Sequence, residues 1–195
     1  DEAHIPVDVI GGTSMGSVIG ALAALGRDAR EIHEALHVAL KLKPFSGVTL
    51  PLVSLLSGKR LEQMMRLLFA DLRIEDLWRR YFCVSCNLTN GSVHAAQSGM
   101  LRQWVLASTS VPGIVPPVID HDELYVDGAL LNNVPADVMS MLNPGPVIAV
   151  NVSSVTELKA GVPDDTDLSG WSLLVNSLGM RRESQRVPGL GRLLV

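Results

Sequence analysis

The chain has 195 residues, enough for about one domain with a buried core. Apolar residues make up 47% and charged residues 18%, a balance that excludes intrinsic disorder. The net charge of −4 and the low aromatic content of 4% argue against nucleic acid as a partner. Two cysteines exclude a disulfide-built scaffold.

Hydrophobic periodicity and turn residues predict alternating strands and helices, which is the α/β class. In chain order we expect a strand at Val7–Gly11, helices at Met15–Leu25, Ala29–Lys43 and Arg60–Phe69, a helical turn at Ile74–Trp78, hairpin strands at Tyr81–Asn87 and Ser92–Ala96, a helix at Met100–Ser108, a strand at Leu124–Val126, a helix at Ala136–Leu142, a buried strand at Val147–Val152 and a helix at Gly170–Leu178.

The uncharged run from Val9 to Gly26 approaches the length of a membrane span. Five of its residues are glycine, so it predicts a strand, a tight turn and a buried helix instead. The first residues, Asp1 to His4, have neither the basic nor the apolar part of a signal peptide. They also lack an initiator methionine, so we expect the chain to start inside a longer protein. We expect a location in the cytoplasm or at the inner face of a membrane.

The turn after the first strand carries a G-x-S-x-G motif, Gly12-Thr13-Ser14-Met15-Gly16. Such a motif needs a strand before it and a helix after it, so that a sharp turn exposes the serine Oγ. Both elements are predicted here. The start of the helix also directs N–H groups and positive potential at the serine. We interpret Ser14 as a nucleophile; the alternative is a glycine-rich turn with a capping serine.

Two further motifs suggest metal or redox chemistry. His33-Glu34-Ala35-Leu36-His37 is an H-E-x-x-H, the zinc motif in which the glutamate acts as general base. It has no third ligand at the usual spacing, and its polar residues flank an apolar helical stripe. Cys83 and Cys86 form a C-x-x-C in a predicted strand, where residues three apart point to opposite faces. We interpret these cysteines as buried small hydrophobes and predict no metal site.

A nucleophilic serine needs a base, and a histidine is the usual one. None of the histidines along the chain stands in a position that marks it as this base. Asp127 is the stronger candidate, because it ends a short apolar strand and precedes Gly128-Ala129, a tight turn that would fix a carboxylate. The alternative is an ordinary Asp-Gly turn. If the pair is real, Ser14 Oγ lies within about 3.2 Å of an Asp127 carboxylate oxygen.

Together these segments resemble the patatin-like phospholipases, most closely the branch of neuropathy target esterase and its bacterial relatives. The G-x-S-x-G is similar to the nucleophile elbow of that family. The segment from Val126 to Ala136, with Asp127-Gly128-Ala129 and Asn132-Asn133-Val134-Pro135-Ala136, is similar to its second signature. Ile74–Trp78 and the stretch from Ala107 to Pro117 also resemble segments of this branch.

The resemblance implies a single catalytic domain over residues 1–195 with a three-layer α/β/α fold, incomplete at the N-terminus and at the C-terminus. It implies Ser14 as nucleophile and Asp127 as general base, acting through an acyl-enzyme without a cofactor. The implied reaction is hydrolysis of carboxylic esters in lipids, often lysophospholipids. The alternatives are a non-catalytic lipid-binding remnant and a zinc hydrolase acting through the H-E-x-x-H.

The family carries a glycine-rich oxyanion loop ahead of the elbow, and these 195 residues contain no such loop. The Met15 backbone N–H is then the donor expected for the oxyanion. Losing one oxyanion donor costs about 10²–10³ in turnover, so we expect this chain to be a poor enzyme beside a longer one. Near the end, Arg181, Arg182, Arg186 and Arg192 lie beside apolar residues, a composition that suits peripheral contact with an anionic membrane.

Overall fold

A computed structural model describes residues 5–44, 46 and 54–152, and one compact unit ends at Val150. The helix predicted at Gly170–Leu178 and the arginine-rich segment lie outside the described residues. The elements in chain order are β1 (Val9–Thr13), α1 (Met15–Ala24), α2 (Ala29–Leu40), α3 (Lys59–Phe69), the 3-10 turn η1 (Ile74–Asp76), β2 (Arg80–Asn87), β3 (Ser92–Ala96), α4 (Leu101–Ser108), β4 (Val118–Asp120), β5 (Glu123–Asp127), the 3-10 turn η2 (Gly128–Leu130) and α5 (Ala136–Leu142).

The sheet is built around β2, which pairs with three other strands. β1 runs parallel to the first half of β2, β5 runs antiparallel to the second half, and β3 runs antiparallel beside it. Val84 pairs with both β1 and β3, and Ser85 pairs with both β3 and β5. A strand has two edges, so β3 occupies one edge, while β1 and β5 share the other end to end.

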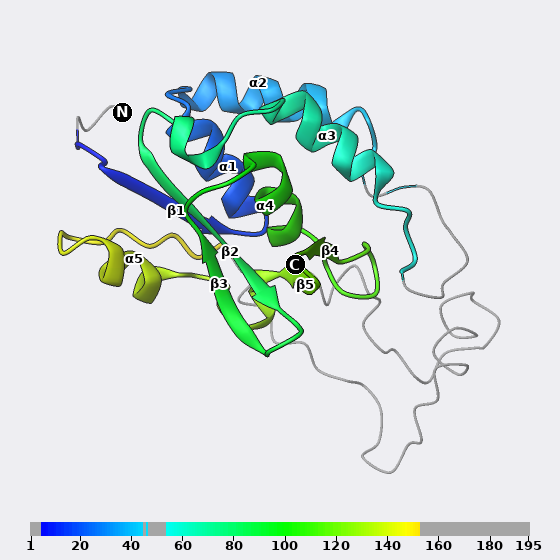
Figure 1. Cartoon of the computed structure of the whole chain (residues 1–195). Helices are drawn as coiled ribbons and strands as arrows, with labels where there is room; N and C mark the ends of the chain where they lie inside the picture. Colours follow the sequence, from blue (N-terminus) through cyan, green and yellow to red (C-terminus); the bar gives the residue numbers. More distant parts are fainter. Residues whose placement is uncertain (1–4, 45, 47–53, 153–195) are drawn as a thin grey trace, which may run out of the picture. The chain divides into compact units, whose positions relative to one another are not determined.

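Helices cover both faces of this mixed sheet, giving the α/β/α arrangement that the family resemblance implies (Figure 1). Side chains alternate along β2, as a strand requires. Tyr81 and Cys83 join the larger core with residues of α1 to α4, and Phe82 and Val84 join the smaller core against α5. Because both faces are covered, β2 is buried from Tyr81 onward and reads as a nearly continuous apolar run.

β1 begins two residues later than the sequence predicts and includes Gly11, Gly12 and Thr13. Strand propensity disfavours these glycines, but pairing with β2 and packing override it. Gly11 pairs with Phe82, and a Cβ on Gly11 would lie 2.1 Å from the Phe82 ring. The glycine therefore makes room for the largest side chain of the smaller core.

One predicted strand does not form, and one observed strand was not predicted. Val147–Val152 is not a strand, and Ile148, Val150 and Val152 are 74%, 75% and 89% exposed. An apolar run alone does not supply a pairing partner, and no described strand pairs with this one. The short strand β4 was missed because two prolines precede it and it has only three residues; it pairs with β5 across the turn at His121 and Asp122.

Within residues 5–44, 46 and 54–152, no helix is both long and apolar enough to cross a membrane.

The two glycines of the G-x-S-x-G differ in what surrounds them. A Cβ on Gly12 would lie 2.4 Å from the Gly16 backbone, whereas a Cβ on Gly16 would meet nothing within 4 Å among the described residues. Gly12 therefore lets α1 pack directly on β1, and Gly16 has no such task.

Replacing each glycine by alanine tests this difference. We expect Gly12→Ala to lower the free energy of unfolding by about 1–3 kcal/mol or more, because the clash is with backbone. Gly16→Ala should leave it unchanged or raise it by up to about 1 kcal/mol, because alanine favours a helix. Thermal unfolding of both variants measures this, and equal melting temperatures would contradict the packing argument.

Candidate active site

The sheet brings two distant residues together at one point of β2. Thr13, the last residue of β1, pairs with Val84, and Asp127, the last residue of β5, pairs with Ser85. The strands approach this point from opposite directions along the same edge, so their carboxyl ends meet. Ser14 directly follows Thr13, which places it beside Asp127.

Ser14 is held in an unusual backbone conformation, with φ 54° and ψ −127°. Residues other than glycine rarely adopt positive φ, and the strain costs of the order of 1–3 kcal/mol. The Ser14 carbonyl oxygen accepts hydrogen bonds from the Ser17 N–H at 2.9 Å and the Ser17 hydroxyl at 2.6 Å. Ser14 thus forms the sharp turn between β1 and α1 that the motif predicts.

The Ser14 hydroxyl donates a hydrogen bond to Asp127 Oδ2 at 2.7 Å, across 113 residues of sequence. This confirms the distance predicted from the sequence. The other carboxylate oxygen, Oδ1, accepts the Ala129 N–H at 2.9 Å. The turn at Gly128-Ala129 therefore fixes the orientation of the carboxylate, as the tight-turn interpretation required.

Asp127 is 4% exposed, and this burial raises the pKa of its carboxyl group above the ordinary value. The hydrogen bonds from the Ala129 N–H and the Ser14 hydroxyl act in the opposite direction, because they stabilise the charged form. Burial is the larger effect. A carboxylate with a raised pKa is a stronger proton acceptor than an ordinary aspartate.

Ser108, the last residue of α4, and Ser110, two residues beyond it, hold the pair, and neither was assigned a role from the sequence. The Ser14 N–H donates to Ser108 Oγ at 2.9 Å, and the Ser108 hydroxyl donates to the Val84 carbonyl at 2.6 Å. The Asp127 N–H donates to the Ser110 carbonyl at 2.9 Å. The only sequence signal was the resemblance of Ala107–Gly113 to a family segment, which carried no function.

Close packing at Gly128 and a bond from Thr13 complete the junction. A Cβ on Gly128 would lie 2.4 Å from the Val84 carbonyl oxygen and 3.0 Å from Thr13 Cγ2. The Thr13 hydroxyl donates to the Asn132 carbonyl at 2.8 Å. Of the motif residues predicted from sequence, Gly12, Thr13 and Gly128 therefore build the turns that carry Ser14 and Asp127.

The first N–H groups of α1 have no partner inside the helix, as at any helix N-terminus. Met15 and Gly16 are the first two residues of α1, and both are exposed next to Ser14. These N–H groups carry the positive end of the helix dipole. They are the described donors best placed for a negative charge that develops near Ser14 Oγ.

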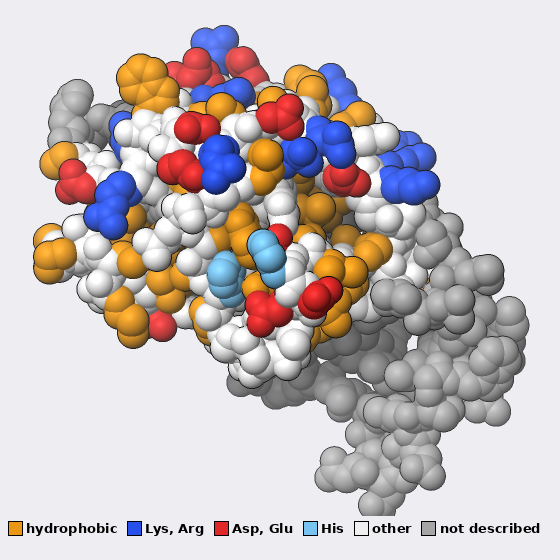
Figure 2. Space-filling model, viewed as in Figure 1, with side chains coloured by type: hydrophobic (Ala, Val, Ile, Leu, Met, Phe, Trp, Pro, Cys, Tyr) orange, Lys and Arg blue, Asp and Glu red, His pale blue; other side chains and the backbone are white. Residues whose placement is uncertain are grey.

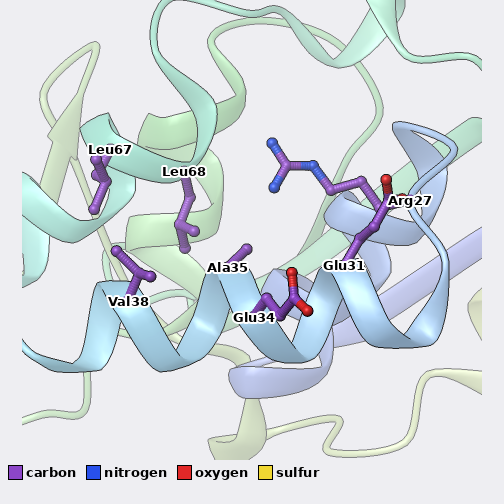
Figure 3. Close-up of a pocket in the computed structure, with 7 residues that line it drawn as sticks. All are labelled: Arg27, Glu31, Glu34, Ala35, Val38, Leu67 and Leu68. Carbon is purple, nitrogen blue, oxygen red and sulfur yellow. The ribbon is translucent and has the colours of Figure 1, made fainter.

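The H-E-x-x-H lies on the exposed side of α2. Glu34 is paired with Arg30 at 3.0 Å and lines a hollow of about 410 Å³ between α2 and α3 (Figure 3). The rings of His33 and His37 are 6.4 Å apart. In the part of the chain that the structure describes, no three His, Cys, Asp or Glu residues are grouped to hold a metal. Acidic and basic side chains are mixed over α2 and α3, as on an ordinary solvated face (Figure 2).

Both cysteines, His94 and His121 have structural surroundings. Cys83 and Cys86 are free and buried on opposite faces of β2, and burial raises the pKa of Cys83 to about 12. The His94 ring packs against Trp104, with ring centroids 4.5 Å apart. His121 lies in the exposed turn after β4, paired with Asp120. In the described residues, the side chain bonded to Ser14 Oγ is the Asp127 carboxylate.

The fold and this pair define an α/β protein with a serine and an aspartate joined at the ends of two strands. A sequence profile of the family described as patatin-like phospholipase matches residues 1–140. Patatin-like phospholipase domain-containing protein 6 of Mus musculus is 34% identical over 200 residues, covering 99% of this chain and 15% of its own length.

Two other relatives carry different names. Neuropathy target esterase sws of Drosophila melanogaster is 34% identical over 196 residues, 97% of this chain and 14% of its own length. Lysophospholipase NTE1 of Mycosarcoma maydis is 30% identical over 197 residues, 97% of this chain and 10% of its own. The chain belongs to the patatin-like phospholipase family. It spans 10–15% of the length of these curated relatives.

Backbone strain at Ser14 predicts an unusual order of stability between two substitutions. Ser14→Ala loses the hydrogen bond to Asp127 and keeps a Cβ at positive φ. Ser14→Gly loses the same bond and relieves the strain, and this outweighs the entropy that glycine gains in the unfolded chain. We therefore expect Ser14→Gly to melt at a higher temperature than Ser14→Ala, and the reverse order would refute strain at this turn.

Burial of Asp127 predicts how its replacement changes stability with pH. Its folded pKa lies above the unfolded value, so the folded protein keeps a proton that the unfolded chain releases, and stability falls as pH rises through that interval. Asp127→Asn removes the buried charge and can keep hydrogen bonds to Ala129 and Ser14. We expect the variant to melt above wild type at neutral pH, with the difference shrinking in acid. A pH-independent difference in melting temperature would contradict this.

Proposed function

We propose that the protein is a serine ester hydrolase of lipids, with Ser14 as the nucleophile and Asp127 as the general base. The observation that carries the proposal is the 2.7 Å hydrogen bond from Ser14 Oγ to Asp127 Oδ2. Membership of the patatin-like phospholipase family supports a lipid as the substrate. One relative is named a lysophospholipase and another an esterase, and we extend the lysophospholipid substrate to this chain on that basis.

In the first half of the reaction Ser14 Oγ attacks the ester carbonyl carbon, and its proton passes to Asp127 Oδ2. The carbonyl oxygen becomes negatively charged in a tetrahedral intermediate. The intermediate collapses when the bond to the leaving alcohol breaks, and Asp127 returns the proton to that alcohol. The products of this half are the free alcohol, such as a glycerophospho-alcohol, and an acyl group on Ser14.

In the second half, water attacks the acyl carbonyl and gives its proton to Asp127. The second tetrahedral intermediate expels Ser14 Oγ, which takes the proton back from Asp127. A fatty acid leaves, and the serine and carboxylate are as they were at the start. Electrons and protons balance without a cofactor or a metal.

The raised pKa of Asp127 suits this role, because a base works best when its pKa lies near the working pH. The carboxyl must be ionised to accept the proton, so activity falls in acid as Asp127 becomes protonated. Burial moves this acid limb to a higher pH than an ordinary aspartate would give. The N–H groups of Met15 and Gly16 are the donors we propose for the oxyanion.

The two rival functions have less support. A non-catalytic lipid-binding remnant would need neither the strained backbone of Ser14 nor a buried carboxylate, and both reduce stability. A zinc hydrolase acting through His33, Glu34 and His37 would need a further ligand, and Glu34 is already engaged by Arg30. Peripheral contact with a membrane remains a proposal that follows from the lipid substrate.

Covalent labelling with a fluorophosphonate tests the proposal directly, since the probe phosphonylates an activated serine. We expect one adduct, located on Ser14 by peptide mass spectrometry. Ser14→Ala should abolish labelling, and Asp127→Asn should slow it by roughly a hundredfold or more, as loss of a general base does. EDTA should change neither labelling nor hydrolysis of a lysophospholipid.

Ser92→Ala is a matched control, because Ser92 is an exposed serine in β3 whose hydroxyl bonds to Asn90, away from Ser14. It should be labelled as fast as wild type. Labelling that persists in Ser14→Ala would overturn the assignment of Ser14 as the nucleophile. Loss of activity on addition of EDTA would favour the zinc alternative. A folded wild-type protein that binds lipid but takes no label would favour the remnant.

A further inference from the structure

We infer that Ser108 is a positioning residue that holds Ser14 in its reactive backbone conformation. The inference rests on the proposed function, because it assigns a task at the same site. Ser108 is fully buried at the end of α4, and its hydroxyl lies between the nucleophile turn and β2. It links three elements that are far apart in sequence.

The direction of both hydrogen bonds at Ser108 is fixed by chemistry. The Ser14 N–H can only donate and the Val84 carbonyl can only accept, whereas a hydroxyl has one proton to give. Ser108 therefore gives its proton to Val84 at 2.6 Å and presents a lone pair to the Ser14 N–H at 2.9 Å. The β2 carbonyl thereby orients the hydroxyl as an acceptor for the nucleophile's own backbone.

This acceptor counters the strain at Ser14. A residue at positive φ stays there only when its surroundings hold it from several sides. Ser17 holds the Ser14 carbonyl, and Ser108 holds the Ser14 N–H. Without the second bond the peptide before Ser14 can rotate toward an ordinary conformation, which carries Oγ away from Asp127. A displacement of about 1 Å at a reacting group costs roughly a hundredfold in rate.

The neighbouring hydroxyl has a different role, which makes it a control. Thr109 is also buried, and its one hydroxyl proton is shared between the carbonyls of Val105 and Leu106 in α4. Thr109→Val thus removes a buried hydroxyl from the same helix end while retaining side-chain volume. Ser108→Ala removes a hydroxyl as well, but one that reaches the Ser14 turn.

The experiment compares these two variants in the full chain, first by a measurement that does not depend on activity and then by enzyme kinetics. Amide hydrogen exchange of Ser14, followed by NMR on ¹⁵N-labelled protein, reports the bond itself. We expect faster exchange at Ser14 in Ser108→Ala and no change there in Thr109→Val. With a lysophospholipid, kcat and the fluorophosphonate labelling rate should fall roughly ten- to hundredfold in Ser108→Ala, with KM nearly unchanged. Thr109→Val should stay within about threefold of wild type in both rates.

If Ser108 only stabilises the fold, Ser108→Ala will lower the melting temperature and leave kcat per reactive serine unchanged. That result would overturn the inference. Equal Ser14 exchange in the two variants would also overturn it. Ser108→Cys, whose sulfur is a weak acceptor, should show the same losses and decides the question if Ser108→Ala does not fold. If wild type takes no label, the proposed function fails, while the exchange data still test Ser108.

Discussion

One edge of β2 serves two strands, and the site depends on this sharing. β1 ends against Val84 and β5 ends against Ser85, so neighbouring residues of a single strand set the distance between the turn at Ser14 and the turn at Asp127. The rigid strand replaces any need for a long loop to bring Ser14 and Asp127 together. The shared edge also brings the two turns into close packing. Gly128 must lack a side chain, because its Cβ would lie 2.4 Å from the Val84 carbonyl oxygen.

Two features that lower stability coincide at this junction. Ser14 has positive φ, and Asp127 is a carboxylate with its charge removed from solvent. By contrast, α2 has a regular capping box at Asp28 and Glu31 and an apolar stripe facing the core. Positive φ also occurs at Lys43, Ala70, His121 and Asp122, so backbone strain alone does not mark a site. At Ser14 the strain coincides with a hydrogen bond to a buried carboxylate, and this combination is typical of a functional site. The surrounding hydrogen bonds to Ala129, Ser17 and Ser108 hold the costly point in place.

Much of this could be read from the sequence, because the signals were local. The helices followed from their apolar periodicity. The turns made Ser14 and Asp127 candidates and left ordinary turns as the alternatives, and the family resemblance implied that the two residues act as a pair. Ser108 could not be found in the same way. A hydroxyl near the end of a helix looks like Thr109, which bonds back to its own helix. Its real partners depend on where β2 places the Val84 carbonyl, and sequence does not encode register so directly. Val147–Val152 failed for the same reason, because an apolar run does not name its partner strand.

The two glycines of the G-x-S-x-G motif need different explanations. Packing of α1 on β1 accounts for Gly12, since any side chain there would enter the helix backbone. Nothing in the described fold requires Gly16 to lack a side chain, because Gly16 is exposed and a Cβ there would meet no atom within 4 Å. That open space adjoins the first N–H groups of α1, where a negatively charged oxygen would be stabilised. Packing therefore accounts for Gly12, and the oxyanion site that we propose at the start of α1 gives a reason for Gly16.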